Sequence, residues 1–303
     1  MNRCVIIGYK GQDGRLLSES LHHEGHEVIG LGRGDLDLLD PKAVLDFLCI
    51  KRPDHLYYLA ATHHSSEDQV PISDPELFRR SFDLHLHGLV SFLEGIRKGS
   101  PDTRLFYAAS SHVFGQPKES PQTENTPFHP QNIYGISKVA GVEACRFYRN
   151  AYRVHASCGI LYNHESSYRA EKFVSQKIIK GALAIARGER DHLTLGNLNA
   201  SIDWGYAPDF IEAMKQILLL DESGDFIIAT GEPHTVGEFV EIAFGELGLN
   251  WQQWVKVNPA LITKEQSQLV GDSSKLKAAT GWQPTLSFTQ MVSLLLKSER
   301  DAR

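Results

Sequence analysis

Short apolar runs alternate with longer amphipathic stretches through the first half of the chain. The short runs are almost entirely apolar, as in strands buried on both faces, and they span Arg3–Ile7, Glu27–Leu31, His55–Leu59, Arg104–Ala108 and His155–Leu161. Between them, apolar residues three and four positions apart predict helices over Arg15–Glu24, Pro41–Lys51, Pro75–Lys98 and Ile133–Tyr152. This alternation predicts an α/β fold with a doubly wound parallel sheet, whose ligands bind at the carboxyl ends of the strands.

The pattern changes at about residue 163. From there, helices and short strands are separated by turn-rich stretches such as Gly196-Asn197 and Gly231–Pro233. No linker rich in glycine, serine or proline divides the chain. We therefore expect residues 1–162 to form a Rossmann-like domain. Residues 163–303 are expected to form a smaller C-terminal substrate-binding lobe, with some chain returning to the sheet.

Composition narrows the class of protein. The 303 residues are 42% hydrophobic and 22% charged, as in an ordinary globular protein. No apolar run is long enough to cross a membrane, and the N-terminus enters the first predicted strand without a signal peptide. A formal charge of -6 offers no broad positive field to nucleic acid. We expect a cytoplasmic protein that binds neither nucleic acid nor membrane.

Cysteine and histidine spacing argues against a metal site. The cysteines never form a C-x-x-C pair, and we expect reduced thiols in the core at Cys4, Cys49, Cys145 and Cys158. None of the 14 histidines belongs to an H-E-x-x-H or Cys/His zinc pattern. The sequence therefore predicts no metal.

Residues 8–14, GYKGQDG, form a G-x-x-G-x-x-G motif between the first predicted strand and the first predicted helix. Glycine permits a tight turn and close approach of the backbone to a pyrophosphate, whose charge faces the N-terminal amides of the helix. The strand before the motif and the helix after it are the context that dinucleotide binding requires. We therefore expect a dinucleotide cofactor.

The residue after the second strand indicates which dinucleotide. NAD-selective sites place an acid there for the ribose hydroxyls, whereas this chain has Gly32-Arg33. A guanidinium suits a 2'-phosphate by charge and bidentate geometry, which favours NADP. Asp35 lies close enough in sequence to keep NAD possible.

A serine, a tyrosine and a lysine form the candidate catalytic group. Tyr134 and Lys138 lie four residues apart, on one face of a predicted helix. Free tyrosine titrates near pH 10, so a tyrosine base needs its phenolate stabilised, which a neighbouring ammonium can do. Ser110, at the end of the fourth strand, can hydrogen-bond a substrate hydroxyl and hold it against Tyr134.

These motifs resemble the extended short-chain dehydrogenase/reductase family and, within it, the GDP-mannose 4,6-dehydratases. The likeness runs through GYKGQDG, ASSHVFG, NIYGISK, Gly159–Ile178, Leu195–Phe210, Ile228–Glu241 and Leu269–Pro284. The Gln-Asp of the glycine turn and the Asn163–Ser166 stretch select the dehydratase branch. The Tyr/Lys pair alone selects only the superfamily.

The resemblance implies NADP, a nucleotide-sugar substrate that is GDP-linked, and a set of binding residues. The implied cofactor residues are Gly8, Gly11, Gln12, Asp13, Gly14, Arg33, Asp37, Leu38, Leu59, Ala60, Ala61, Thr62, His63, Tyr134, Lys138, His164 and Arg169. The implied substrate residues are Asn163, Lys177, Asn197 and Lys264. His164 as a core histidine and Lys177 as a solvated helix charge are the alternatives.

One departure from the family bears on catalysis. The family reaction oxidises the C4 hydroxyl and so acidifies the C5 proton. Loss of that proton and of the C6 hydroxyl gives an enone, and the hydride returns to C6. The family carries a glutamate for the elimination two residues after the catalytic Ser or Thr, where this chain has His112. The histidine either replaces the carboxylate, accompanies a loss of elimination, or is a bystander.

Other departures concern the substrate and the assembly. Ile202 and Ile262 stand where the family has arginines that clamp the nucleotide pyrophosphate. Lys177 and Lys264 can compensate in part. The chain also runs directly from Arg33 to Asp37, where the family inserts a segment that its tetramers use, so we expect a homodimer.

Three hypotheses remain at this point. The first is an NADP-dependent nucleotide-sugar 4,6-dehydratase in which Ser110, His112, Tyr134 and Lys138 are catalytic. The second keeps the hydride step but drops elimination, giving a 4-epimerase, 4-dehydrogenase or 4-keto reductase. The third is a cofactor-binding sensor without turnover, against which the retained Ser/Tyr/Lys group argues.

Overall fold

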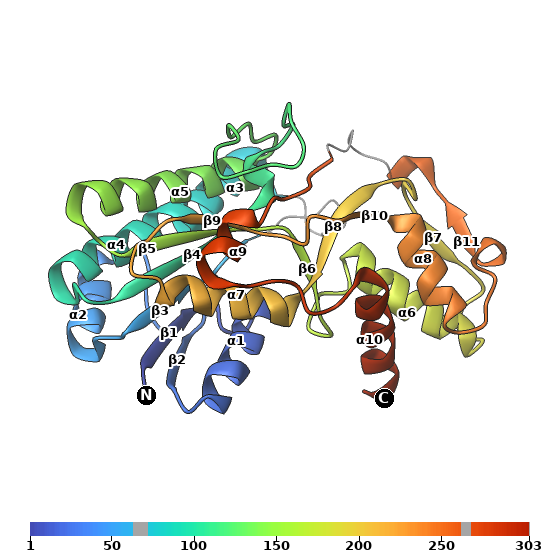
Figure 1. Cartoon of the computed structure of the whole chain (residues 1–303), viewed down its shortest axis with the longest axis horizontal. Coiled ribbons are helices and arrows are strands. Elements are labelled where there is room, and N and C mark those ends of the chain that lie inside the picture. The colour runs from blue at the N-terminus through green and yellow to red at the C-terminus, as the bar shows by residue number, and fades with distance from the viewer. Residues whose placement is uncertain (63–71, 262–267, 303) are drawn as a thin grey trace.

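The computed structural model describes residues 1–62, 72–261 and 268–302. Helices flank a central parallel sheet in the larger part of the molecule, and a second group of helices and short strands lies at the end of that sheet (Figure 1). The described residues contain no helix with both the length and the apolar character needed to traverse a bilayer.

The main sheet has six strands in the order β2-β1-β3-β4-β5-β9, all paired in parallel. Their bounds are β1 Arg3–Ile7, β2 Glu27–Leu31, β3 His55–Tyr58, β4 Arg104–Ser110, β5 Ala156–Leu161 and β9 Asp225–Ile228. The chain proceeds from β1 to one side and then crosses back to β3 on the other. This reversal opens a crevice beyond the carboxyl ends of β1 and β3, where doubly wound sheets bind ligands.

Each face of the sheet has its own apolar core. On one face pack α2 Pro41–Lys51, α4 Gly88–Gly99 and α5 Ile133–Tyr152. On the other pack α1 Gln12–His23, α7 Ala207–Leu219 and α9 Ser274–Thr280. Figure 1 shows α5 and α7 on opposite sides of β4 and β5. The doubly wound α/β fold predicted from the apolar runs is therefore confirmed.

The expected helix Pro75–Lys98 is interrupted. The structure has α3 Asp74–Phe82, a π-helical turn over Asp83–His87, and then α4. The helical periodicity of the sequence extends across the turn, so it could not reveal the wider winding. π-turns inside helices often mark functional sites, and this one carries the fully buried His85.

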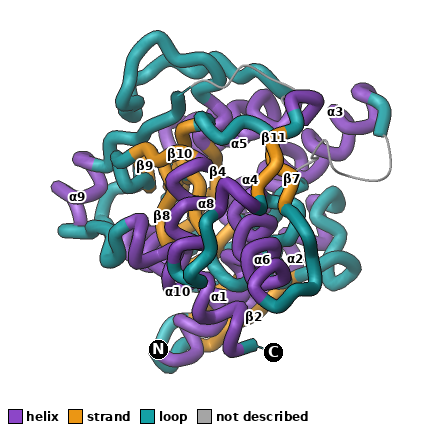
Figure 2. Tube along the Cα trace, turned by 90° about the vertical axis from the view of Figure 1, so that its right-hand side faces the viewer, coloured by secondary structure: helices purple, strands orange, loops and turns teal. Residues whose placement is uncertain are grey.

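The second group of elements packs around its own core. A small sheet has the order β10-β8-β6, and β7 pairs with β11. Their bounds are β6 Asn163–Glu165, β7 Leu193–Leu195, β8 Ser201–Tyr206, β10 Pro233–Thr235 and β11 Val255–Val257. The helices are α6 Val174–Ala186, α8 Val236–Gly245 and α10 Phe288–Asp301. Figure 2 shows these three helices side by side, and they share one apolar cluster. Short 3-10 helices span Ser111–Val113, Trp251–Gln253 and Pro259–Leu261.

Two sequence expectations need correction. Helix α1 begins at Gln12 rather than Arg15, because the last turn of the glycine motif is already helical. Cys4, Cys145 and Cys158 are buried, but Cys49 is exposed. Cys49 lies on α2 next to the buried Leu48, and its position points it away from the face that packs on the sheet.

Candidate active site

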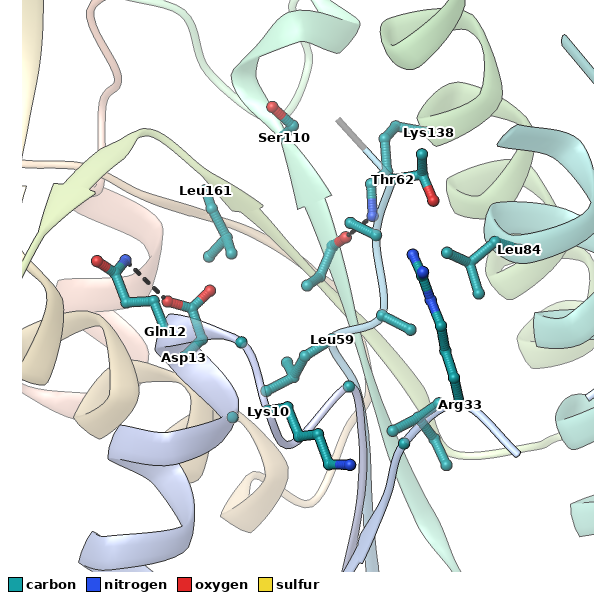
Figure 3. A pocket seen from close by; sticks show the side chains of 18 of the residues that line it. Lys10, Gln12, Asp13, Arg33, Leu59, Thr62, Leu84, Ser110, Lys138 and Leu161 are labelled. Carbon is teal, nitrogen blue, oxygen red and sulfur yellow. Dashed lines mark hydrogen bonds between the residues drawn. The ribbon is translucent and has the colours of Figure 1, made fainter. Parts of the chain in front are cut away.

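A cavity of about 1580 Å³ lies at the carboxyl ends of β1, β2, β3 and β4. Its lining includes every predicted cofactor residue except His63, which falls outside the described residues. The four predicted catalytic residues and Asn163 also line it. The structure thus brings together groups from the glycine turn, β4, α5 and β6. Figure 3 shows the glycine turn facing Ser110 of β4 and Lys138 of α5.

The glycine turn has the shape that a dinucleotide phosphate needs. Gly8 has a φ of +92°, and a Cβ there would lie 2.8 Å from the backbone nitrogen of Ala60. A Cβ on Gly14 would lie 2.4 Å from Tyr9 Cα and 2.5 Å from the Gly8 carbonyl oxygen. Gly11, the N-cap of α1, supplies no side-chain cap, so the helix N-terminus presents its own amides to the cavity.

Arg33 and Asp35, the two candidates for recognising the ribose, are placed differently. Arg33 lines the cavity, and its side chain extends toward Leu84 and Thr62 (Figure 3). Asp35 instead turns back on its own loop, where its carboxylate accepts a hydrogen bond from the Gly32 amide at 2.8 Å. This arrangement fits a cofactor with a 2'-phosphate better than one with a free hydroxyl.

Ser110, Tyr134 and Lys138 converge where β4 ends and α5 begins. Lys138 is almost fully buried, and its Nζ donates to the Ala108 carbonyl at 2.7 Å and lies 5.6 Å from the centroid of the Tyr134 ring. Burial lowers the pKa of Lys138 to about 7, and the charge of Asp13 opposes this only in part.

Burial also controls Tyr134. It raises the pKa of the phenol to about 12, although a hydrogen bond with Ser110 and the charge of Arg169 act in the opposite direction. The protein's own residues therefore keep the tyrosine protonated at neutral pH. The expected lowering of this pKa by the Lys138 ammonium is not found: burial disfavours the phenolate, and it also lowers the pKa of Lys138.

His112 lies at the place of the family glutamate, on the 3-10 helix after β4. Its ring stands edge-on to the Tyr134 ring, with centroids 5.7 Å apart. Its Nδ1 is 3.0 Å from Nδ2 of Asn132. Asn132 in turn caps α5, because its Oδ1 accepts from the Gly135 amide at 2.8 Å. Sequence analysis did not single out Asn132, although an asparagine just before a helical pattern is a recognisable N-cap.

His164, on β6, forms an ion pair with the glycine turn. Its Nε2 lies 3.0 Å from Asp13 Oδ1, and its Nδ1 lies 2.7 Å from the Tyr162 carbonyl oxygen. Both neighbours only accept hydrogen bonds, so both ring nitrogens donate and the ring is cationic. Gln12 strengthens the junction by donating to the His164 carbonyl at 3.1 Å and accepting from Ser166 at 2.9 Å.

The pKa shifts agree with this pairing. Burial would raise the pKa of Asp13, but His164, Gln12 and Arg169 outweigh it and lower the pKa to about 2. Burial would lower the pKa of His164, but Asp13 outweighs it and raises the pKa. The lowered pKa of Asp13 stabilises the fold at any pH above the ordinary carboxyl pKa, and this contribution is lost as the pH falls toward 2. The raised pKa of His164 stabilises the fold at any pH below the ordinary imidazole pKa, and this contribution is lost as the pH rises through the raised pKa.

Asp13→Asn is therefore expected to cost most stability between about pH 4 and pH 6.5, where the ion pair is complete. The expected loss in the free energy of unfolding is about 2 kcal/mol, as for a charge-assisted hydrogen bond. Urea unfolding of wild type and variant at pH 5.5 and pH 9 measures it. Asp46→Asn, at an exposed position of α2, is the control. A difference that does not shrink at pH 9 would contradict the ion pair.

His85, which sequence analysis missed, does not line the cavity but packs behind Tyr134 and supports it. The Thr62 amide donates to its Nε2 at 3.1 Å, which leaves the proton on Nδ1. That nitrogen lies 2.8 Å from Ser137 Oγ, which donates to the Tyr134 carbonyl at 2.9 Å. The ring thus connects the loop after β3 to the start of α5. A histidine within an apolar helical pattern was the only available signal.

Among the described residues, the predicted substrate residues Lys177 and Asn197 do not line the main cavity. Lys177 lines a second cavity of about 430 Å³ with Arg190 and His192. Asn197 shapes the loop before β8, where its Oδ1 accepts from the Asn199 amide at 3.0 Å. Lys264 lies outside the described residues, as does Ile262.

Comparison with known proteins agrees with this geometry. A family model described as GDP-mannose 4,6 dehydratase matches residues 33–295. GDP-mannose 4,6 dehydratase 2 of Arabidopsis thaliana is 35% identical over 328 residues, covering 98% of this chain and 86% of the relative. GDP-mannose 4,6-dehydratase of Vibrio cholerae is 32% identical over 357 residues, covering 99% and 94%.

Solved structures give the same fold. RMD from Pseudomonas aeruginosa complexed with NADPH superposes with a TM-score of 0.84 at 22% identity, over 100% of both chains. The family model and the curated relatives confirm the resemblance inferred from the glycine turn, the Tyr/Lys pair and the Asn163–Ser166 stretch. This chain belongs to the GDP-mannose 4,6-dehydratase family.

Proposed function

We propose that this protein is an NADP-dependent enzyme that oxidises C4 of a nucleotide sugar and then eliminates water between C5 and C6. The observation that carries the proposal is the convergence of Ser110, Tyr134 and Lys138 in the same cavity as the glycine turn. Relatives named GDP-mannose 4,6-dehydratase over nearly the whole chain support the reaction class and a GDP-linked sugar.

The chain's own residues divide the first step among them. Ser110 accepts or donates a hydrogen bond at the C4 hydroxyl and orients it. Tyr134 takes the hydroxyl proton. Lys138, fixed by the Ala108 carbonyl, holds the cofactor ribose and offers a charge to the phenolate. Bound NADP supplies the hydride acceptor for C4. Because burial opposes the phenolate, the oxidation is expected to accelerate as pH rises.

The substrate's nucleotide is proposed to reach the second cavity. Lys177, Arg190 and His192 line it together with Asp191, and the three basic side chains outnumber the one carboxylate, which suits a pyrophosphate. Ile202, where the family has an arginine, removes one clamp, so these basic side chains are expected to carry more of the binding.

His112 gives specific support to a second candidate, C4 oxidation without elimination, as in a 4-epimerase, 4-dehydrogenase or 4-keto reductase. An imidazole replaces the carboxylate that the family uses to move the C5 proton, and Asn132 already occupies one of its nitrogens. A sensor without turnover is disfavoured, because it would have no use for a Ser/Tyr/Lys group gathered in the cofactor cavity.

One assay separates these functions. Purified protein is incubated with NADP and a panel of nucleotide sugars, and product masses are measured. Loss of one water identifies the dehydratase. Loss of two hydrogens, or an unchanged mass with inverted C4, identifies the second candidate. Failure to convert any sugar while NADP binds would overturn the enzymatic proposal.

Arg33→Ala tests cofactor choice. Removing a guanidinium that pairs with a 2'-phosphate is expected to weaken NADP binding by about 10- to 100-fold, as for a lost charge-assisted hydrogen bond. Affinity for NAD, measured by the same titration, is the control and should change little. An equal loss for both dinucleotides would show that Arg33 does not recognise the phosphate.

The assembly and location remain part of the proposal. Phe147 and Tyr152 are exposed on α5 and would be covered in a homodimer built on that helix. The exposed free thiol of Cys49 suits a reducing compartment, which supports a cytoplasmic location.

A further inference from the structure

The side-chain amide of Asn132 contacts the Gly135 amide and the His112 ring. These two contacts show which of its end atoms is the oxygen and which is the nitrogen. Oδ1 faces the Gly135 amide at 2.8 Å, the bond that caps α5. A backbone N–H can only donate, so the atom facing it must be the amide oxygen. The other atom, 3.0 Å from His112 Nδ1, must therefore be the NH₂ group.

The same reasoning then fixes the proton of His112. An NH₂ group can only donate, so Nδ1 must offer its lone pair. A neutral imidazole with a lone pair at Nδ1 carries its proton at Nε2. An imidazolium would set an N–H against an N–H, which the contact with Asn132 disfavours.

The backbone holds this arrangement rigidly. A Cβ on Gly135 would lie 2.5 Å from the His112 carbonyl oxygen, so the first turn of α5 packs directly on the 3-10 helix that carries His112. The His112 amide also bonds Ser110 Oγ at 3.3 Å. Asn132 and His112 therefore keep their spacing without help from a ligand.

We propose that Asn132 is a positioning residue that holds His112 as its neutral Nε2–H tautomer. His112 then offers the substrate a hydrogen-bond donor, suited to a sugar hydroxyl or keto oxygen, and not a base for the C5 proton. This role toward the sugar rests on the proposed function, whereas the placement of the proton does not. Because an Nε2–H ring cannot take the C5 proton, this assignment supports the second candidate function, C4 oxidation without elimination, and a dehydratase would need another group to remove that proton.

The tautomer can be measured directly. Two-bond ¹H–¹⁵N correlation spectra of the full chain, with ¹⁵N-labelled histidine, distinguish a protonated ring nitrogen from one with a lone pair. His112→Asn identifies the resonances of His112. We expect Nδ1 unprotonated and Nε2 protonated at neutral pH. A protonated Nδ1 would overturn the proposal.

Asn132→Asp tests whether the position of the His112 proton controls the elimination of water. Aspartate caps helices as well as asparagine, and its second carboxylate oxygen would accept a proton from Nδ1, leaving Nε2 with a lone pair. This is the way a carboxylate makes a histidine a base in a catalytic triad. We expect the proton to move to Nδ1 and the ratio of water loss to C4 oxidation to rise by roughly tenfold or more.

Asn250→Asp is the matched control, because the Asn250 side chain also caps a helix, the short one over Trp251–Gln253, and lies outside the cavity lining. It should change neither the spectrum nor the ratio. An Asn132→Asp protein whose His112 spectrum matches wild type would contradict the proposal. If wild type shows the Nε2–H ring but oxidises no nucleotide sugar, the proposed function fails while the tautomer assignment stands.

Discussion

Tyr134→Phe is expected to lower the rate of C4 oxidation by about 10²- to 10⁴-fold, the usual effect of removing a general base. The ring remains, so its edge contacts with His85 and His112 are kept. Only the hydroxyl that would take the C4 proton is lost. Stopped-flow measurement of NADPH formation gives the rate, and a titration gives NADP affinity, which should stay close to that of wild type.

Tyr168→Phe is the control for this experiment. Tyr168 also lines the cavity, but its hydroxyl donates to Glu19 at 2.7 Å, away from the Ser110 and Tyr134 pair. Its loss should leave the rate of C4 oxidation nearly unchanged. Equal losses in the two variants would mean that neither phenol is the base.

Gly14→Ala is expected to damage both the fold and the cofactor site. The added Cβ would lie 2.4 Å from Tyr9 Cα, so the backbone of the glycine turn must move. Overpacking of this kind costs about 1–3 kcal/mol of unfolding free energy. The same shift misplaces the amides at the start of α1, and NADP affinity should fall by more than about tenfold. Urea unfolding and cofactor titration measure the two effects.

Gly245→Ala separates the contact from the general effect of adding a methyl group. No atom lies within 4 Å of a Cβ at that position in α8. Alanine is favoured over glycine in helices, so stability should stay the same or rise slightly. If Gly14→Ala behaves like Gly245→Ala, the turn is not as tight as described.

The main sheet could be predicted because its strands, apart from the partly exposed edge strand β2, are buried on both faces, and continuous apolar runs are what such burial requires. The runs Arg3–Ile7 and Glu27–Leu31 match β1 and β2. The sequence did not single out β9, since Asp225–Ile228 is only four residues long and pairs with a strand far earlier in the chain. The π-turn before α4 was also missed, because its apolar spacing is that of a helix.

The candidate site likewise has features that the sequence reveals and features that only the fold reveals. The glycine turn and the Tyr134/Lys138 pair are local spacings, so the sequence reveals them. The contacts of His112 with Asn132, and of Asp13 with His164, join segments that only the fold brings together. The pKa of Tyr134 was predicted from the nearby lysine alone, and burial, which cannot be deduced from spacing, proved the stronger influence.

The late entry of β9 into the sheet has a consequence for biosynthesis. β5 pairs with β9 along Cys158–Leu161, so the emerging chain has an open sheet edge until Asp225–Ile228 leaves the ribosome. During that interval the nascent nucleotide-binding half is exposed to strand pairing with other chains. A shortened transcript ending near residue 162 would make this exposure permanent, and its product would be a substrate for chaperones and proteases.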